Sequence, residues 1–126
     1  MPDQEESTAT ATVVAALDTE IASSLASVWA RYVGARPADS EMEFDGKVVR
    51  WVIADGTAAF AEGMAAEAEE GAPPRPERTM TGYKRDTAAA VAKATHRRVV
   101  AVISKHDKKT DIVRETFILD SPRKKY

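Results

Sequence analysis

The stretch RRVVAVISKHDKKTDIVRETFIL, residues 97–119, decides the fold, because two apolar runs flank a polar segment. This pattern predicts a β-hairpin. In its second run Val113, Phe117 and Leu119 share one face, since strand side chains alternate with a period of two residues. Glu115 falls in the middle of that same face. A carboxylate in an apolar row requires an explanation.

The expected register of this hairpin gives the carboxylate room. A turn over residues 106–110 would place Val99 opposite Phe117 and Ala101 opposite Glu115. Because alanine is small, the Glu115 side chain could turn there toward a cationic partner. A turn one residue longer or shorter would undo this pairing.

Three explanations of Glu115 remain open from the residues alone. The face could be only partly covered, so that the carboxylate reaches water or pairs with Lys47, Arg97 or Arg98. It could lie at a symmetric subunit interface, buried against an Arg or Lys of the partner chain. It could also be a site carboxylate that binds a ligand or moves protons.

A first hairpin is predicted by SEMEFDGKVVRWVI, residues 40–53. Asp45-Gly46 separates two alternating runs and favours a two-residue type I′ turn. That turn would place Met42 opposite Val49 and would pair Glu41 with Arg50 on the other face. The expected apolar face consists of Met42, Phe44, Val49, Trp51 and Ile53.

Three helices complete the pattern. Apolar residues at three- and four-residue spacing predict a helix over residues 12–33, ended by Gly34. An alanine-rich segment predicts a second helix with Thr57 as its N-cap. A third is predicted from Gly82 to Thr95. Its expected inner side consists of Tyr83, Thr87, Val91 and Ala94.

The order of elements predicts an α+β protein: one antiparallel sheet, built from two hairpins, with helices on one face in the order α-β-β-α-α-β-β. We expect residues 1–10 to be disordered, 11–120 to form one domain, and 121–126 to be a basic tail. Three prolines within residues 71–79 predict an extended loop inside the domain.

Composition narrows the class of protein. The chain of 126 residues has no cysteine, which excludes disulfide scaffolds and thiol chemistry. No apolar run is long enough for a membrane helix, so we expect a cytoplasmic protein. The net charge of residues 1–77 is −10 and that of residues 78–126 is +8. Such polarity favours head-to-tail self-association or an anionic partner on one side.

Signals for catalysis are weak. His96 and His106 show no metal-binding spacing, and no serine lies in a nucleophile elbow. We therefore expect no catalytic residue, no metal and no cofactor. His96 is expected to cap a helix end, and His106 to be solvated in a lysine-rich turn.

Basic residues mark the candidate anion contacts, which are Lys105, Lys108 and Lys109. Arg97 and Arg98 lie at the other end of the same predicted strand, so two basic spots result rather than one stripe. Sequence-specific nucleic-acid binding is not expected.

The order of motifs resembles the MpsC-like family of small bacterial proteins. The similarity covers residues 20–120, and its most specific part runs from Thr95 through Asp111-Ile112 to E-x-F-x-L at 115–119. His96 stands where glycine would be natural. The candidate interface or ligand contacts are Glu115, Arg97, Arg98, Asp111 and Ser104.

The family name derives from a membrane-potential-generating system linked to ion and inorganic-carbon uptake. The resemblance implies an accessory or regulatory role near such a system, without enzymatic activity. We expect a homodimer that binds a protein partner at the membrane or a small anionic ligand. The alternative is an electrostatic binder of anionic membrane surface or nucleic acid.

Overall fold

The computed structural model describes residues 2–66, 71 and 78–121, with side chains described from residue 16 onward. Its elements, in chain order, are α1 (Pro2–Val33), β1 (Asp39–Phe44), β2 (Val48–Ala54), α2 (Gly56–Ala65), α3 (Met80–Thr95), β3 (Val99–Asp107) and β4 (Ile112–Leu119). This order confirms the predicted α+β class. The predicted loop over 71–79 and the tail fall largely outside the described residues.

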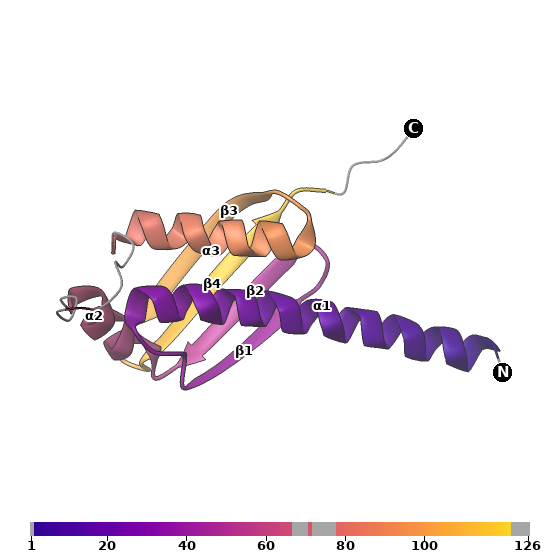
Figure 1. The fold of residues 1–126 in the computed structure, drawn as a ribbon, viewed down its shortest axis with the longest axis horizontal. Helices are drawn as coiled ribbons and strands as arrows, with labels where there is room; N and C mark the ends of the chain where they lie inside the picture. Colours follow the sequence, from indigo (N-terminus) through magenta and orange to yellow (C-terminus); the bar gives the residue numbers. More distant parts are fainter. Residues whose placement is uncertain (1, 67–70, 72–77, 122–126) are drawn as a thin grey trace.

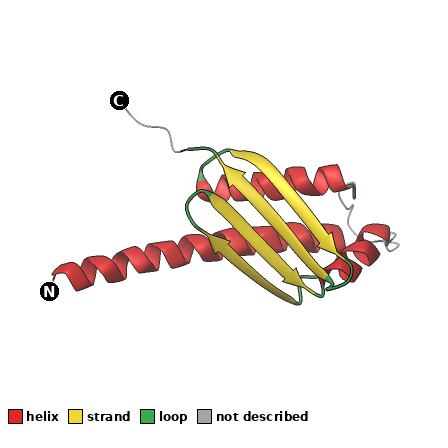
Figure 2. Ribbon diagram, turned by 180° about the vertical axis from the view of Figure 1, so that it is seen from behind, coloured by secondary structure: helices red, strands yellow, loops and turns green. Residues whose placement is uncertain are grey.

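The strands form one antiparallel sheet in the order β1-β2-β4-β3. Helices α1 and α3 lie side by side across one face of it (Figure 1). Seen from behind, the strands stand in front of both helices (Figure 2). We call the helix-covered side the inner face and the other side the outer face. The sheet and its two long helices therefore form two layers.

The core fills the space between these layers. Trp29 on α1 is central to it, because its ring lies edge-on to Trp51 with centroids 6.1 Å apart and also contacts Phe60 and Tyr83. The buried apolar residues are Ile21, Leu25, Val28, Trp29, Tyr32, Val49, Trp51, Ile53, Phe60, Tyr83, Val91, Ala94, Val113, Phe117 and Leu119. The predicted helix stripes and the predicted inner face of the first hairpin are thus confirmed where side chains are described.

Helix α1 begins earlier than the sequence predicts. It includes residues 2–10, which we expected to be disordered. The predicted end is confirmed, since Gly34 has a φ of 93° and its N–H donates to Ala30 O at 2.9 Å.

Helix α2 does not have the expected cap. Asp55 is the N-cap, with a left-handed φ of 54°, and Thr57 is buried and donates instead to Asp107 O at 3.3 Å. Gly63 allows the helix to approach the end of α1, because a Cβ there would lie 2.4 Å from Val33 O. The close contact of α1 and α2 therefore requires glycine.

The turn of the first hairpin differs from the predicted type I′ turn. The Asp45 carboxylate accepts hydrogen bonds from Lys47 N and Val48 N, both at 2.9 Å, and so closes a longer loop. Met42 consequently lies opposite Trp51, two residues beyond the expected Val49. A shift of two residues leaves every side chain on its predicted face.

The expected Glu41–Arg50 pair is absent as a consequence. Glu41 lies opposite Val52, and Arg50 lies opposite Glu43. Arg50 approaches Asp45 in the turn instead, at 3.5 Å. Both of those side chains are about half exposed, so the pair contributes little stability.

The register of the second hairpin was predicted wrongly. Ser104, not Ala101, lies opposite Glu115. Strand β3 continues to Asp107, whose carboxylate accepts from Lys109 N at 2.9 Å and closes a shorter turn than expected. A shift of three residues is odd, so it moves Ala101 to the outer face.

A β-bulge at the start of β3 then returns Val99 to the face on which it was predicted. Val99 lies opposite Leu119 while Ala101 lies opposite Ile118, which leaves Val100 unpaired between them. Val99 consequently stays on the inner face, whereas Val100 and Ile103 are 50% and 45% exposed. The outer face gains apolar surface that the sequence pattern assigned to the core.

Candidate functional site

Glu115 is the centre of a polar cluster inside the core. It is only 1% exposed and lies on the inner face of β4. The Ser104 hydroxyl donates to Glu115 Oε2, and His106 Nε2 lies 3.3 Å from Oε1. Both partners lie on the neighbouring strand β3, so the observed register brings the three side chains together.

His106 was expected to be solvated, and this prediction is wrong. Its side chain is 19% exposed and lies on β3 rather than in the turn. Its ring stands edge-on to Phe60, with centroids 4.8 Å apart. The sequence carried a usable signal, because His106 and Ser104 alternate on one face of a strand once β3 is extended to Asp107.

Tyr83 of α3 lies over the same region. It is fully buried, and its hydroxyl has no hydrogen-bond partner. Burial raises the pKa of the Tyr83 hydroxyl, and the nearby Glu115 charge raises it further. The phenol therefore stays neutral and remains an unpartnered polar group in the core.

This Glu115 cluster (Glu115, Ser104, His106 and Tyr83) contains residue types used in acid–base chemistry. Its carboxylate oxygens, however, are both engaged within the chain and shielded from solvent. A groove and a smaller pocket occur elsewhere, and neither is lined by any of the four residues. The geometry is that of a satisfied buried carboxylate.

The cationic partners expected for Glu115 lie elsewhere. Arg97 donates to the backbone carbonyls of Gly46 and Asp120, which ties the first turn to the end of β4. Arg98 is exposed, and Lys47 lies in the first turn. Because Glu115 points toward the helix layer, it is also not placed to contact another subunit.

Asp111 holds a helix in place. Its carboxylate accepts from Ala58 N at 2.9 Å, and its carbonyl accepts from Gly56 N at 2.9 Å. It thus caps α2 from the β3–β4 turn, a role that Asp55 does not fill. The sequence placed Asp111 in a family pattern but gave no sign of this contact.

The candidate anion contacts are exposed but not gathered. Lys105 lies on the outer face of β3, and Lys108 and Lys109 lie in the following turn. Arg97 and Arg98 precede the opposite end of β3. The two separate basic spots that the sequence predicts are therefore present in the described residues.

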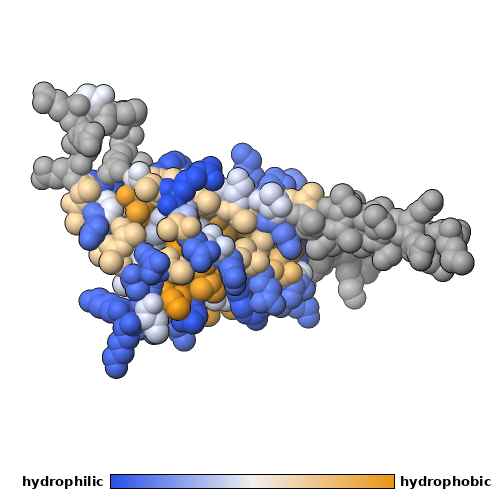
Figure 3. Space-filling model, turned by 90° about the horizontal axis from the view of Figure 1, so that it is seen from below, coloured by the Kyte–Doolittle hydropathy of each residue, from blue (hydrophilic) through white to orange (hydrophobic). Residues whose placement is uncertain are grey.

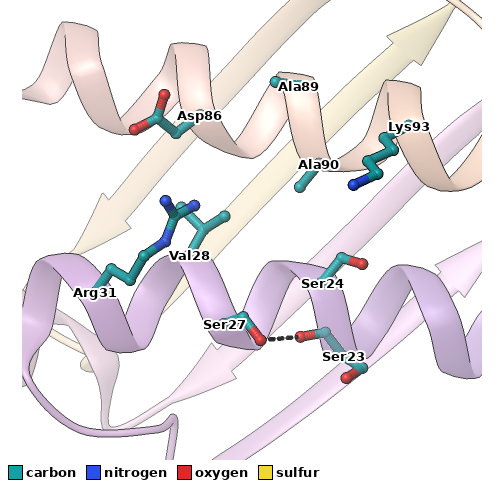
Figure 4. Close-up of a pocket in the computed structure, with 9 residues that line it drawn as sticks. All are labelled: Ser23, Ser24, Ser27, Val28, Arg31, Asp86, Ala89, Ala90 and Lys93. Atoms are coloured by element: carbon teal, nitrogen blue, oxygen red, sulfur yellow. Dashed lines mark hydrogen bonds between the residues drawn. The ribbon is translucent and has the colours of Figure 1, made fainter. Parts of the chain in front are cut away.

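A groove of about 480 Å³ lies between α1 and α3 (Figure 4). Arg31 and Lys93 contribute positive charge to it, and α1 contributes hydroxyl groups from Ser23, Ser24 and Ser27. These side chains lie on the solvent side of the helix layer. The groove was not predicted, because it requires the antiparallel pairing of two helices far apart in sequence.

Asp86 is the acidic residue of this groove, and it is already engaged. The Tyr32 hydroxyl donates to Asp86 Oδ2 at 2.5 Å, and Arg85 Nε lies 3.2 Å from Oδ1. The Tyr32 hydrogen bond, with a smaller contribution from Arg85, lowers the pKa of the Asp86 carboxyl. Among the described side chains, Lys93 forms no hydrogen bond or ion pair, and it reaches into the groove (Figure 4).

The outer face of the sheet is covered by none of the described helices (Figure 2). Apolar and charged residues are interleaved on it, and Arg50 and Arg114 lie on the two central strands. The outward residues are Glu41 and Glu43 on β1, Val48, Arg50 and Val52 on β2, Arg114, Thr116 and Ile118 on β4, and Ala101, Ile103 and Lys105 on β3. Figure 3 shows the molecule from below relative to Figure 1, and on this side too apolar residues lie together, bordered by hydrophilic ones.

Within the described part of the chain, no helix is long and apolar enough to cross a membrane. No three His, Cys, Asp or Glu side chains of those residues are grouped to hold a metal ion. No protein-family model matches the chain, and neither a curated protein nor a solved structure matches it. The functional argument therefore depends on the chain's own geometry.

Proposed function

We propose that this is a non-enzymatic binding protein that acts through the outer face of its sheet. The observation that carries the proposal is the difference in cover: two helices bury the inner face, whereas apolar Ile103 remains 45% exposed on the outer face. Exposed apolar side chains interspersed with arginine are typical of protein interaction sites. The MpsC-like resemblance adds an accessory role, which such a surface would serve.

The Glu115 cluster supports a structural role better than a catalytic one. A general acid or base must reach a substrate atom within about 3 Å, directly or through one water. Glu115 is 1% exposed, and its two oxygens accept hydrogen bonds from Ser104 and face His106. The cluster fixes β3 to β4 and so stabilises the sheet that presents the outer face.

The absence of cysteine allows a direct test of whether the outer face is covered. Ala101→Cys places one thiol on the outer face, and Ala61→Cys places one on exposed α2 as a matched control. Labelling rates with a membrane-permeant maleimide would be compared inside cells that make the protein and in dilute purified protein. We expect labelling at position 101 to slow at least about tenfold in cells, relative to position 61, as for a desolvated interface.

Equal labelling of the two positions in cells would contradict the proposed function, whichever partner was assumed. Unfolded protein should label equally at both positions, which controls for intrinsic reactivity. Because each change replaces an exposed alanine, neither should disturb the core.

The groove between α1 and α3 supports a second candidate function, the binding of a small anion. Its volume of about 480 Å³ lies within the usual range of small-molecule sites. The specific observation is Lys93, whose ammonium group has no described partner while Asp86 is held by Tyr32. A carboxylate or phosphate group could pair with Lys93 beside the serine hydroxyls.

Titration calorimetry with citrate and with inorganic phosphate tests this second candidate. We expect Lys93→Ala to weaken binding about fivefold or more, consistent with loss of one charge-assisted hydrogen bond. Lys47→Ala removes an exposed lysine outside the groove and should leave binding unchanged. No heat of binding from either anion would remove the candidate.

A further inference from the structure

The outer face carries its charges in register across all four strands. Glu41 lies opposite Val52, Val52 opposite Arg114, and Arg114 opposite Lys105. One row therefore runs from an acidic residue on β1, through an apolar residue on β2, to two basic residues on β4 and β3. No ion pair within the described residues involves Glu41, Arg114 or Lys105.

The adjacent rows differ from this one. The next row runs from Glu43 on β1 through Arg50 on β2 and Thr116 on β4 to Ile103 on β3, so its centre is polar and its β3 end is apolar. The row after it places Val48 opposite Ile118 in the middle of the sheet. The outer face thus has acidic residues on β1, Arg50 and Arg114 on the two central strands and Lys105 on β3. Its apolar residues gather toward the end of the sheet that holds Val48, Ile118 and Ala101.

Two ways of packing a pair of such sheets with aligned strands differ in the charges that they bring together. Two copies packed face to face need a two-fold axis in the plane between their sheets. If the axis runs parallel to the strands, β1 of each copy lies opposite β3 of the other. If the axis runs across the strands, β1 lies opposite β1, and the acidic edges oppose each other.

We propose that the partner of the outer face is a second copy of this chain, related by a two-fold axis parallel to the strands. Glu41 then lies opposite the partner's Lys105, and Lys105 opposite the partner's Glu41, which gives two ion pairs per dimer. Val48 packs on the partner's Ile118, again twice. Sheets packed in this way keep their strands within about 30° of each other.

Less favourable contacts accompany this geometry. Arg114 lies opposite the partner's Val52, Arg50 opposite the partner's Thr116, and Glu43 opposite the partner's Ile103. Asp39 and the partner's Asp107 would lie at the same end of the strands, as acidic residues on opposed edges. The Asp107 carboxylate already accepts hydrogen bonds from Lys109 N and Thr110 N, at 2.9 and 3.4 Å. These local donors offset part of its negative charge.

This inference rests on the proposed function, because it names the partner of the same surface. Charge-reversal variants test the second-copy inference separately from the proposed function. The variants are Glu41→Lys, Lys105→Glu and the double variant, with Glu62→Lys on α2 as a control of equal charge change. The dimer dissociation constant of each purified protein would be measured by sedimentation equilibrium.

Each single reversal replaces two attractive contacts by two repulsive ones, so we expect the dissociation constant to rise about tenfold or more. The double reversal exchanges the signs and should restore the wild-type value to within about threefold. Glu62→Lys should leave the value unchanged. Denaturant unfolding of each variant checks that the fold is intact, which surface reversals should preserve.

Two outcomes would overturn the inference. A wild-type chain that stays monomeric at high concentration excludes the second copy, and a dimer indifferent to all three reversals excludes the axis. In either case, slow labelling of Ala101→Cys in cells would still support the proposed function with another partner. Equal labelling of positions 101 and 61 in cells would contradict both this inference and the proposed function.

Discussion

The two faces of this sheet are built from the same four strands but are completed differently. The inner face is sealed within the chain by α1 and α3, and it even accommodates Glu115 by supplying Ser104 and His106. The outer face has apolar residues and an ordered charge pattern but no covering element in the described structure. The comparison shows that a polar residue can belong to a well-packed core when its hydrogen-bond partners come from the same chain. The apolar residues of the outer face have no such cover, and we propose that they form the interface.

The largest expected contrast compares one apolar residue from each face. Trp51→Ala removes a buried ring that contacts Trp29, so the free energy of unfolding should fall by about 3–5 kcal/mol. Ile103→Ala on the outer face should cost less than about 1 kcal/mol in the isolated chain. Urea unfolding in dilute protein measures both, and similar losses for the two variants would contradict the assignment of faces.

Adjacent residues of β4 sharpen the comparison. Glu115→Ala leaves a cavity and removes the acceptor of Ser104 and His106, so we expect a loss of about 2–3 kcal/mol. Thr116→Ala, one residue away on the outer face, should cost less than about 1 kcal/mol. Thermal unfolding of the two variants measures the difference. If Glu115→Ala were as stable as wild type, the cluster would have no structural role.

The smallest effect at neutral pH is expected at Tyr83. Its hydroxyl has no partner, so Tyr83→Phe should change the stability by less than about 1 kcal/mol at pH 7. Tyr32→Phe, the matched control, loses the hydrogen bond to Asp86 and should be destabilised by about 1 kcal/mol or more.

Tyr83→Phe should also change the stability at alkaline pH. The pKa of Tyr83 is raised by burial above its unfolded value of about 10. Its contribution to stability is therefore complete below about pH 10 and is lost as the pH rises toward the folded-state pKa. Tyr83→Phe should flatten this alkaline loss in unfolding measurements between pH 9 and 11, whereas an unchanged slope would place the hydroxyl in contact with solvent.

The fold was predictable because its main patterns tolerate small errors. In the first hairpin the turn was wrong by two residues, yet Met42 and Phe44 kept their inner-side positions. The helix stripes were read correctly because Ile21, Leu25 and Val28 recur at helical spacing whatever the exact helix ends. Periodicity determines the faces, and most errors at turns leave it intact.

The Glu115 cluster was less predictable, because it depends on whether the strand register is shifted by an odd or an even number of residues. In the second hairpin the Asp107 carboxylate closes the turn, and the register is shifted by an odd number of residues. This shift brings Ser104 and His106 of β3 next to Glu115. The bulge at Val100 then restores Val99 to the core side. Side-chain hydrogen bonds in a turn and a single unpaired residue have no periodic signature, so alternation alone could not reveal them.

The most direct test of the account is the mass of the wild-type chain in solution, measured by light scattering over a range of concentrations. The account predicts twice the mass of one chain, and a return to the mass of one chain for Ile103→Glu, which places a charge on the outer face. A wild-type protein with the mass of a single chain at every concentration would contradict the claim that a second copy completes the sheet.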